Sequence, residues 1–124
     1  MTASKLFAWA ALLLFVIAGF SACAHAAAAT PLPKEVNVTV TASEFKYEPA
    51  TITVRTGQTV NLTFKNGGTV IHEFRLLDLD PRVETKAEPG DSDTVTFTAP
   101  VAGLYKFVCL IPEHEAMVGE LIVQ

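Results

Sequence analysis

The stretch Val36-Asn-Val-Thr-Val-Thr41 decides the class of fold, because apolar and polar side chains alternate in it at every step. A period of two is typical of a half-buried β-strand. The same alternation, or a short apolar run, recurs at residues 51–55, 59–65, 71–77, 93–98, 105–107 and 118–123. Turn-forming residues separate these segments at Pro49, Gly57, Asn66-Gly67-Gly68, Pro81, Pro89-Gly90, Pro100 and Gly103. We therefore predict an all-β Greek-key β-sandwich or barrel of seven to eight strands, with at most one helical turn, within residues 80–88.

The first 29 residues differ in kind from the rest of the 124-residue chain. Lys5 precedes an apolar run from Leu6 to Phe20, and small residues follow as far as Ala29. This order is typical of a secretory signal peptide. The run is shorter than the roughly 20 residues of a membrane-spanning helix, so a permanent anchor helix is the weaker interpretation. We predict a signal peptide at 1–29, a proline-containing tether at 30–35 and one domain at 36–124.

Two processing sites compete at the end of this signal peptide. Residues 24–29 offer Ala-x-Ala cleavage sites, whereas Phe20-Ser-Ala-Cys23 resembles a bacterial lipobox, in which Cys23 becomes acylated. Either route carries the domain out of the cytoplasm, so we expect a periplasmic or other extracytoplasmic protein. A lipid anchor at Cys23 would be its only attachment to a membrane.

The chain after the leader is acidic. From Thr30 onward, 13 Asp or Glu residues face 8 Lys or Arg residues, a formal charge of −5. An acidic chain without a basic stripe is a poor ligand for nucleic acid, so we expect no nucleic-acid partner. The length leaves room for one domain, which excludes an enzyme built from several domains, and we expect a monomer.

One short stretch, Cys109-Leu-Ile-Pro-Glu-His114-Glu-Ala-Met117, carries a thiol, an imidazole and a thioether within nine residues. It lies between the last two predicted strands. His72 comes earlier in the chain, close to the Asn66-Gly-Gly turn. Because the loops of a sandwich emerge at its ends, His72 can meet this stretch at one end of the domain. After the leader, the chain has no other Cys, His or Met.

This set of side chains points to a metal site. Two imidazoles and a thiolate in one plane, with a weak axial thioether, form the copper site of electron-transfer proteins. Zinc is the competing metal, because it also binds Cys and His. However, a thioether is a poor zinc ligand, and structural zinc sites usually contain more cysteines. We therefore predict one copper ion bound by His72, Cys109, His114 and Met117.

Five stretches carry a resemblance to a known family: Phe45–Pro49, Thr56–Val60, His72–Phe74, Gly103–Phe107 and Cys109–Gly119. The chain resembles the cupredoxin family of small type 1 (blue) copper proteins, such as plastocyanin, azurin, amicyanin and auracyanin. The resemblance covers nearly the whole chain after the leader and implies the cupredoxin-like fold. It also implies that His72, Cys109 and His114 are equatorial copper ligands and that Met117 is the axial ligand.

The chain departs from the family pattern at two glutamates. Glu73 follows the first histidine, where many members have Asn, and Glu113 stands where many have the Gly of Pro-Gly-His. Glu73 has three interpretations: a solvated side chain, a hydrogen-bond acceptor that replaces the Asn, or a hard metal ligand. The spacing of the ligands also mixes two loop types, because Cys109 and His114 are further apart than His114 and Met117.

The resemblance implies a one-electron carrier that cycles between Cu(I) and Cu(II), with redox proteins as its donor and acceptor. In the family, partners dock on an apolar ring around the second histidine, here formed by Leu110, Ile111, Pro112 and Ala116 around His114. An alternative is copper binding for delivery or tolerance in the cell envelope. We do not expect an enzyme, because four protein ligands leave little room for a substrate on the metal.

Overall fold

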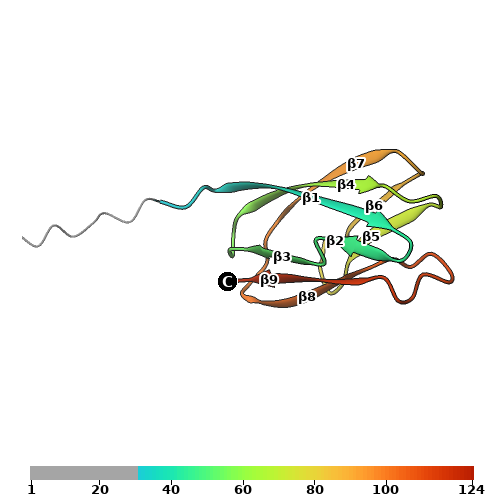
Figure 1. Ribbon diagram of the computed structural model, residues 1–124. Helices are drawn as coiled ribbons and strands as arrows, with labels where there is room; N and C mark the ends of the chain where they lie inside the picture. The colour runs from blue at the N-terminus through green and yellow to red at the C-terminus, as the bar shows by residue number, and fades with distance from the viewer. Residues whose placement is uncertain (1–30) are drawn as a thin grey trace, which may run out of the picture. The chain divides into compact units, whose positions relative to one another are not determined.

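The computed structural model describes residues 31–124, which form two β-sheets packed against each other (Figure 1). The strands are β1 (Glu35–Ser43), β2 (Lys46–Glu48), β3 (Thr51–Val54), β4 (Thr59–Asn66), β5 (His72–Leu76), β6 (Val83–Ala87), β7 (Ser92–Thr98), β8 (Gly103–Val108) and β9 (Val118–Val123). One sheet has the order β2-β1-β4-β7 and the other the order β3-β9-β8-β5-β6. The predicted all-β sandwich is confirmed, with nine strands in the described chain where seven to eight were expected.

The two strands that the alternation did not predict are β2 and β6. Strand β2 has three residues, of which only Tyr47 points into the core. Strand β6 lies where we expected a helical turn, and that prediction was wrong. Its buried residues Val83, Thr85 and Ala87 alternate with exposed ones, but a threonine and an alanine made the alternation faint.

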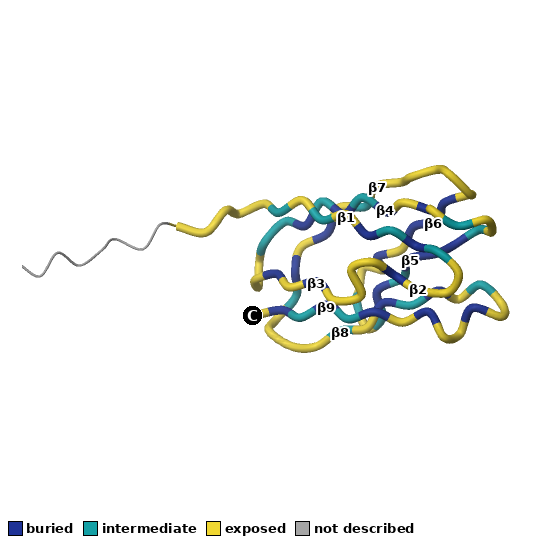
Figure 2. Tube along the Cα trace, viewed as in Figure 1, coloured by how far each residue is buried: buried dark blue, intermediate teal, exposed yellow. Residues whose placement is uncertain are grey.

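The core lies between the sheets and consists of the inward halves of the alternating strands. Val40 on β1 pairs in parallel with Phe64 on β4, and both are fully buried. Aromatic rings fill the centre: the ring centroid of Phe107 lies 4.8 Å from that of Phe74 and 5.0 Å from that of Tyr47. Each buried side chain of this size contributes roughly 1.5–3 kcal/mol to the stability of the fold. Figure 2 shows the result as buried segments that alternate with exposed ones along the strands.

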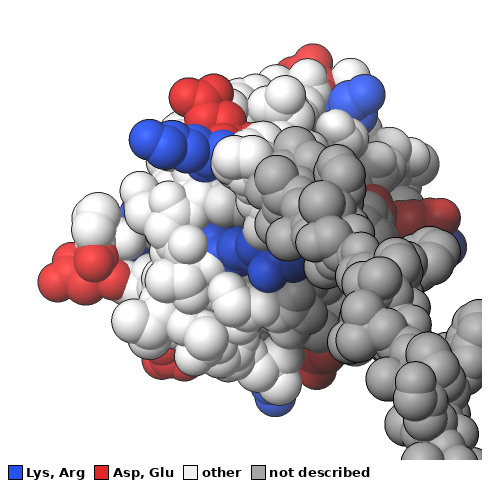
Figure 3. Space-filling view, turned by 90° about the vertical axis from the view of Figure 1, so that its left-hand side faces the viewer, with Lys and Arg blue, Asp and Glu red and all other residues white. Residues whose placement is uncertain are grey.

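The strand register gives the sandwich two distinct ends. The pairing of β1 with β4 runs from Glu35 beside Thr59 to Ala42 beside Asn66, so the β4–β5 loop lies at the end that β1 reaches last. The β8–β9 loop projects at the same end, on the right of Figure 1, and the carboxyl terminus lies at the opposite end. Figure 3 views that opposite end. On the part of it that the described residues form, basic side chains (blue) and acidic side chains (red) are interspersed. The β8–β9 loop and the loop that leads to His72 therefore share one end of the domain.

The predicted signal peptide at 1–29, the alternative anchor helix and the acylation site at Cys23 lie outside the described residues. Residues 31–34 precede β1, which begins one residue before the predicted domain boundary. Within the part of the chain from residue 31 onward, no helix is long and apolar enough to span a bilayer.

Candidate metal centre

His72, Cys109 and His114 come together at the loop end of the sandwich. All three residues are buried, and one ligand atom from each lies within 4.8 Å of the others. His72 is the first residue of β5, Cys109 directly follows β8, and His114 lies in the β8–β9 loop. The structure therefore joins three of the four predicted site residues in one cluster, although His72 is distant in sequence from Cys109 and His114.

The β8–β9 loop folds back on itself through its own main chain. The His114 N–H donates to the Ile111 carbonyl oxygen at 3.1 Å, and the Met117 N–H donates to the His114 carbonyl oxygen at 2.8 Å. The Cys109 N–H donates to the Met117 carbonyl oxygen at 3.3 Å, which closes the loop where it enters β9. Met117, the fourth predicted residue, is fully buried at this closure. These three main-chain bonds hold the loop in this conformation.

The loop before His72 is held by one buried side chain. The amide nitrogen of Asn66 donates to the carbonyl oxygens of Val70, at 2.7 Å, and Ala87, at 2.8 Å. Its amide oxygen accepts the Gly68 N–H at 2.9 Å. Because Ala87 belongs to β6, Asn66 ties the β4–β5 loop to the neighbouring strand and fixes the point where His72 enters β5.

His72 has the features of a metal ligand. The residue is fully buried, yet neither ring nitrogen has a hydrogen-bond partner among the described residues. Buried polar atoms are almost always satisfied, so an unpaired imidazole calls for a missing partner. Burial lowers the pKa of His72, the charge of His114 lowers it further, and the nearby Glu44 carboxylate opposes this shift. A neutral imidazole with a free nitrogen is the form that binds a metal ion.

Cys109 receives two polar contacts at its sulfur. The Glu73 N–H donates to Cys109 Sγ at 3.4 Å, and His114 Nδ1 lies 3.4 Å from the same atom. The thiol is buried and forms no disulfide within residues 31–124. An N–H that points at a thiolate stabilises its negative charge and tunes the redox potential of a metal bound to it. This donor set of one soft sulfur and two imidazoles fits copper.

The structure distinguishes between the three interpretations of Glu73. Its side chain is 2% exposed, so it is not a solvated group. One carboxylate oxygen accepts Arg75 Nη2 at 2.9 Å, and the other accepts the Leu110 N–H at 3.2 Å. Glu73 therefore acts as the hydrogen-bond acceptor that ties β5 to the loop after Cys109. Its carboxylate is not part of the clustered ligand atoms.

Two residues of the β1–β2 turn also line the centre, and sequence reasoning assigned them no role. Phe45 is 48% exposed. Its ring lies edge-on to both imidazoles, and its centroid is 4.8 Å from the centroid of His114 and 6.5 Å from the centroid of His72. Glu44 Oε1 lies 3.5 Å from His72 Nε2. Backbone N–H groups, the Thr69 N–H first, lower the pKa of Glu44 to about 2, so it is a carboxylate at neutral pH. The start of the Phe45–Pro49 stretch was the only signal for this turn.

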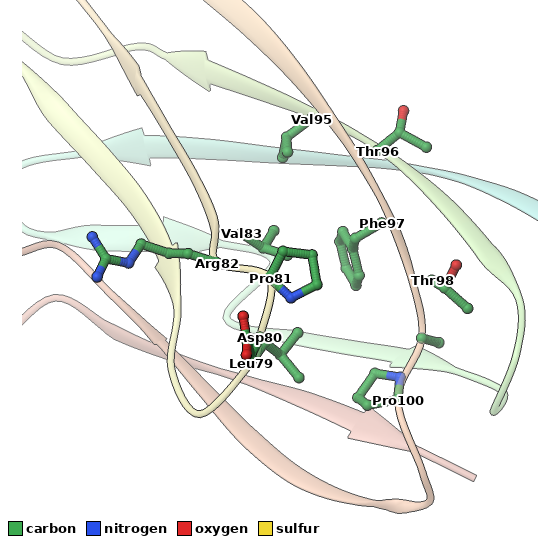
Figure 4. A pocket seen from close by; sticks show the side chains of 11 residues that line it. Leu79, Asp80, Pro81, Arg82, Val83, Val95, Thr96, Phe97, Thr98 and Pro100 are labelled. Carbon is green, nitrogen blue, oxygen red and sulfur yellow. The ribbon is translucent and has the colours of Figure 1, made fainter.

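A separate groove of about 370 Å³ lies where the edge strands β6 and β7 diverge (Figure 4). Its lining is mostly apolar and includes Leu79, Val83, Val95 and Phe97, with Asp80 and Arg82 as the charged members. None of the residues of the metal cluster lines this groove. The chemistry suggested by the sequence therefore lies in the buried cluster and not in the open groove.

Comparison with known proteins places this geometry in context. A model of the cupredoxin-like domain matches residues 10–123. The copper-resistant cuproprotein CopI of Rubrivivax gelatinosus is 34% identical over 105 residues, which are 68% of this chain and 64% of that protein. The chain thus spans less than two thirds of that relative. Auracyanin-A of Chloroflexus aurantiacus is 26% identical over 121 residues, covering 73% of this chain and 75% of that protein.

Solved structures give the same picture. Auracyanin A, described as a "blue" copper protein, superposes with a TM-score of 0.65 at 26% identity, over 73% of this chain and 99% of that chain. Reduced rusticyanin superposes with a TM-score of 0.61 at 27% identity, over 76% of this chain and 82% of that chain. The fold and the family expected from the five matching stretches are thereby confirmed.

Proposed function

The chain belongs to the family of cupredoxin-like domains, and from this premise we propose that it binds one copper ion and carries single electrons between redox partners outside the cytoplasm. The observation that carries the proposal is the buried cluster of His72, Cys109 and His114, whose ligand atoms lie within 4.8 Å of one another. Neither His72 ring nitrogen makes a hydrogen bond to any described residue. When bound, copper would supply one-electron chemistry by cycling between Cu(I) and Cu(II).

His72, Cys109, His114 and Met117 are the residues that would hold the copper ion in this proposal. Their positions are held by contacts of the protein alone: the Asn66 amide before His72, the Glu73 N–H on Cys109, and the main-chain bonds of the β8–β9 loop. A site held in this way changes little when its charge changes, because the ligands are already fixed by the fold. Small rearrangement is what fast electron transfer requires.

The surface above His114 suits a redox partner. Phe45, Val70 and Leu110 are exposed apolar residues on three of the loops at this end, and Leu110 is 54% exposed. His114 itself is 6% exposed and lies beneath Phe45. Exposed Glu113 and Glu115 flank His114 in sequence. This combination fits a partner with a small apolar contact area and a basic rim, whose association would weaken as salt screens the charges.

The test of the proposal is reconstitution of the protein with Cu(II). The expected product has an intense blue charge-transfer band and a narrow copper hyperfine pattern by EPR. Cys109→Ser should abolish the band, whereas Leu110→Ala, which changes the adjacent non-ligand residue, should keep it. A colourless Cu(II) complex of the unmodified chain would overturn the proposal.

A second candidate function is copper binding for delivery or tolerance. The observation in its favour is the similarity to a protein described as copper-resistant. A carrier exchanges electrons rapidly between its Cu(I) and Cu(II) forms and keeps its metal, whereas a delivery protein passes Cu(I) to an acceptor. Mixing the copper-loaded chain with a colourless Cu(I) chelator separates the two: a carrier retains its copper over the time in which it completes many electron exchanges.

The proposed location outside the cytoplasm depends on the predicted signal peptide. Mass spectrometry of the protein purified from its native host gives the first residue of the processed chain. A start within residues 27–30 supports simple secretion, and an acylated Cys23 supports a lipoprotein. An intact Met1 would contradict both.

A further inference from the structure

We propose that Glu44 is a positioning residue of the copper site, whose carboxylate accepts the Nε2–H of His72, directs Nδ1 towards Cys109 and His114, and places a negative charge beside the metal. The inference rests on the proposed copper site and adds to it a residue outside the four ligands. The carrying observation is the distance of 3.5 Å between Glu44 Oε1 and His72 Nε2.

The His72 ring requires such a partner. It is fully buried, and a metal ion satisfies only one of its two nitrogens. In the described chain, neither ring nitrogen makes a hydrogen bond. The Glu44 carboxylate lies within ion-pair distance of Nε2 but does not have hydrogen-bond geometry. A small movement of either side chain completes a bond from Nε2–H to the carboxylate. Histidine ligands usually donate their second N–H to a carboxylate or carbonyl, which fixes the tautomer and the ring orientation.

The carboxylate of Glu44 is itself held in place. Its Oε1 accepts the Thr69 N–H at 2.5 Å and the Val70 N–H at 3.1 Å, both from the loop that leads to His72. Gly68 in the same loop has no side chain, and a Cβ there would overlap the Glu44 carboxylate. The loop therefore wraps closely around this one group. Two N–H donors and a glycine that makes room indicate a built position and not a chance approach of a surface side chain.

The residue that follows Glu44 also lies against the two imidazoles. Phe45 lies edge-on to the imidazoles of both His114 and His72, so the β1–β2 turn covers the pair of rings while Glu44 reaches one of them. The Glu44 side chain is 30% exposed, so water screens part of its charge. Even so, a negative charge at this distance stabilises Cu(II) more than Cu(I), because Cu(II) carries one more positive charge.

The experiment compares Glu44→Gln, Glu44→Ala and the control Glu48→Gln. Glu48 lies on β2 of the same hairpin, its side chain is 80% exposed, and it pairs with Lys46. In Glu44→Gln the amide oxygen still accepts hydrogen bonds but the charge is lost. We expect the preference for Cu(II) over Cu(I) to fall about tenfold, a rise in reduction potential of about 59 mV. Glu44→Ala should weaken copper binding by about 10–100-fold, and the control should match the unmodified chain.

A second measurement needs no copper. In the metal-free chain, ¹⁵N NMR of the His72 ring should show the proton on Nε2, in slow exchange with solvent, and this protection should be lost in Glu44→Ala. A proton on Nδ1, or a Glu44→Gln potential equal to that of the control, would overturn the inference. If the unmodified chain gives no blue copper complex, the proposed function fails first. The tautomer in the metal-free chain separates that failure from one of Glu44 alone.

Discussion

The phenol of Tyr47 donates a hydrogen bond to the main-chain oxygen of Glu73 at 2.6 Å, and this contact joins the two sheets beneath the metal centre. Tyr47 belongs to β2 in the four-stranded sheet, and Glu73 belongs to β5 in the five-stranded sheet. Since the Glu73 N–H donates to Cys109 Sγ, one residue connects the core to the thiol. Burial raises the pKa of Tyr47, so the phenol remains a donor throughout the working range of pH.

Tyr47→Phe should lower the free energy of unfolding of the metal-free domain by about 1–2 kcal/mol, because it leaves the buried Glu73 oxygen without its donor. Urea unfolding measures this difference. Tyr105→Phe is the matched control, since Tyr105 donates to the Val101 oxygen at 2.9 Å at an exposed position. Tyr105→Phe should lower the free energy of unfolding by only a few tenths of a kcal/mol. Equal losses in the two variants would contradict the special position of Tyr47.

Glu73→Gln should keep the blue absorption of the copper form, because the Glu73 carboxylate contacts Arg75 and the Leu110 N–H and not the metal cluster. The loss of a buried charge beside Arg75 should still lower the free energy of unfolding, by about 2 kcal/mol. The loss stays this small because Arg75 keeps its ion pair with Glu84 at 2.8 Å. Glu84→Gln is the control and should cost less than about 1 kcal/mol, as its side chain is 39% exposed. Loss of the blue band in Glu73→Gln would instead make Glu73 a ligand.

Gly119→Ala should destabilise the domain by about 1–3 kcal/mol through overpacking. Gly119 pairs with Phe107 across β8 and β9, and a Cβ at this glycine would overlap the buried Phe107 ring. Thermal unfolding with and without copper measures the change. Gly103→Ala provides the comparison, because its Cβ would meet the Tyr105 ring at an ordinary 3.5 Å. An unchanged stability of Gly119→Ala would contradict this prediction, because it would mean that the fully buried Phe107 ring can move aside freely.

Glu113→Gly should stabilise the domain by about 0.5 kcal/mol. The substitution removes the steric cost of a left-handed backbone in the folded state, and this gain exceeds the conformational entropy that glycine adds to the unfolded chain. Glu113 has a φ of 70°, a conformation that favours glycine. Glu113→Ala removes the same charge but keeps the Cβ, so it should give no such gain. The two variants together separate backbone conformation from charge, and identical unfolding curves for both would contradict the backbone explanation.

The contribution of Asp93 to stability should depend on pH. The Thr85 hydroxyl donates to Asp93 Oδ2 at 2.5 Å between β6 and β7, and this bond, with the Thr94 N–H, lowers the pKa of Asp93 below its ordinary 3.8. A lowered carboxyl pKa stabilises the fold above the unfolded value, and this stability is lost as the pH falls through the folded value.

The measurement compares unfolding of the metal-free chain and of Thr85→Val between pH 7 and the lowest pH at which both fold. The difference between them should be largest above pH 4 and should shrink as the solution becomes more acidic. Thr96→Val removes a hydroxyl that donates to the Asn61 amide at 3.0 Å, a pair that does not titrate. Its effect should stay constant with pH, and a constant effect of Thr85→Val would contradict the role of Asp93.

The sandwich was predictable because most of its strands bury a clear alternate row of large apolar residues. The alternation in Val36–Val40 and in Val60–Phe64 corresponds to faces that the structure buries or half-buries. Strands β2 and β6 were not predicted because each buries few large apolar side chains. One inward tyrosine in β2, and a buried threonine at the centre of β6, give almost no periodic signal.

At the metal centre, the sequence predicted the residues whose chemistry is rare. Cys109, His114 and Met117 are close neighbours in the chain, and His72 stood out as the one other histidine after the leader. Glu44 and Phe45 carried no comparable signal, because acidic and aromatic side chains are common. Their contacts with His72 and His114 arise only when the β1–β2 hairpin packs over the two loops. The role of Glu73 likewise required its buried contacts.

The direction of β1 has a practical consequence for attaching the molecule. Glu35 starts the strand beside Thr59, and the strand runs towards the end that holds His72 and His114. An electrode, bead or fused protein joined ahead of Glu35 is therefore connected to the pole remote from His114. Immobilisation through the amino terminus should leave the imidazole-bearing pole facing solution, whereas coupling through an added cysteine in the β8–β9 loop should bring that pole against the support.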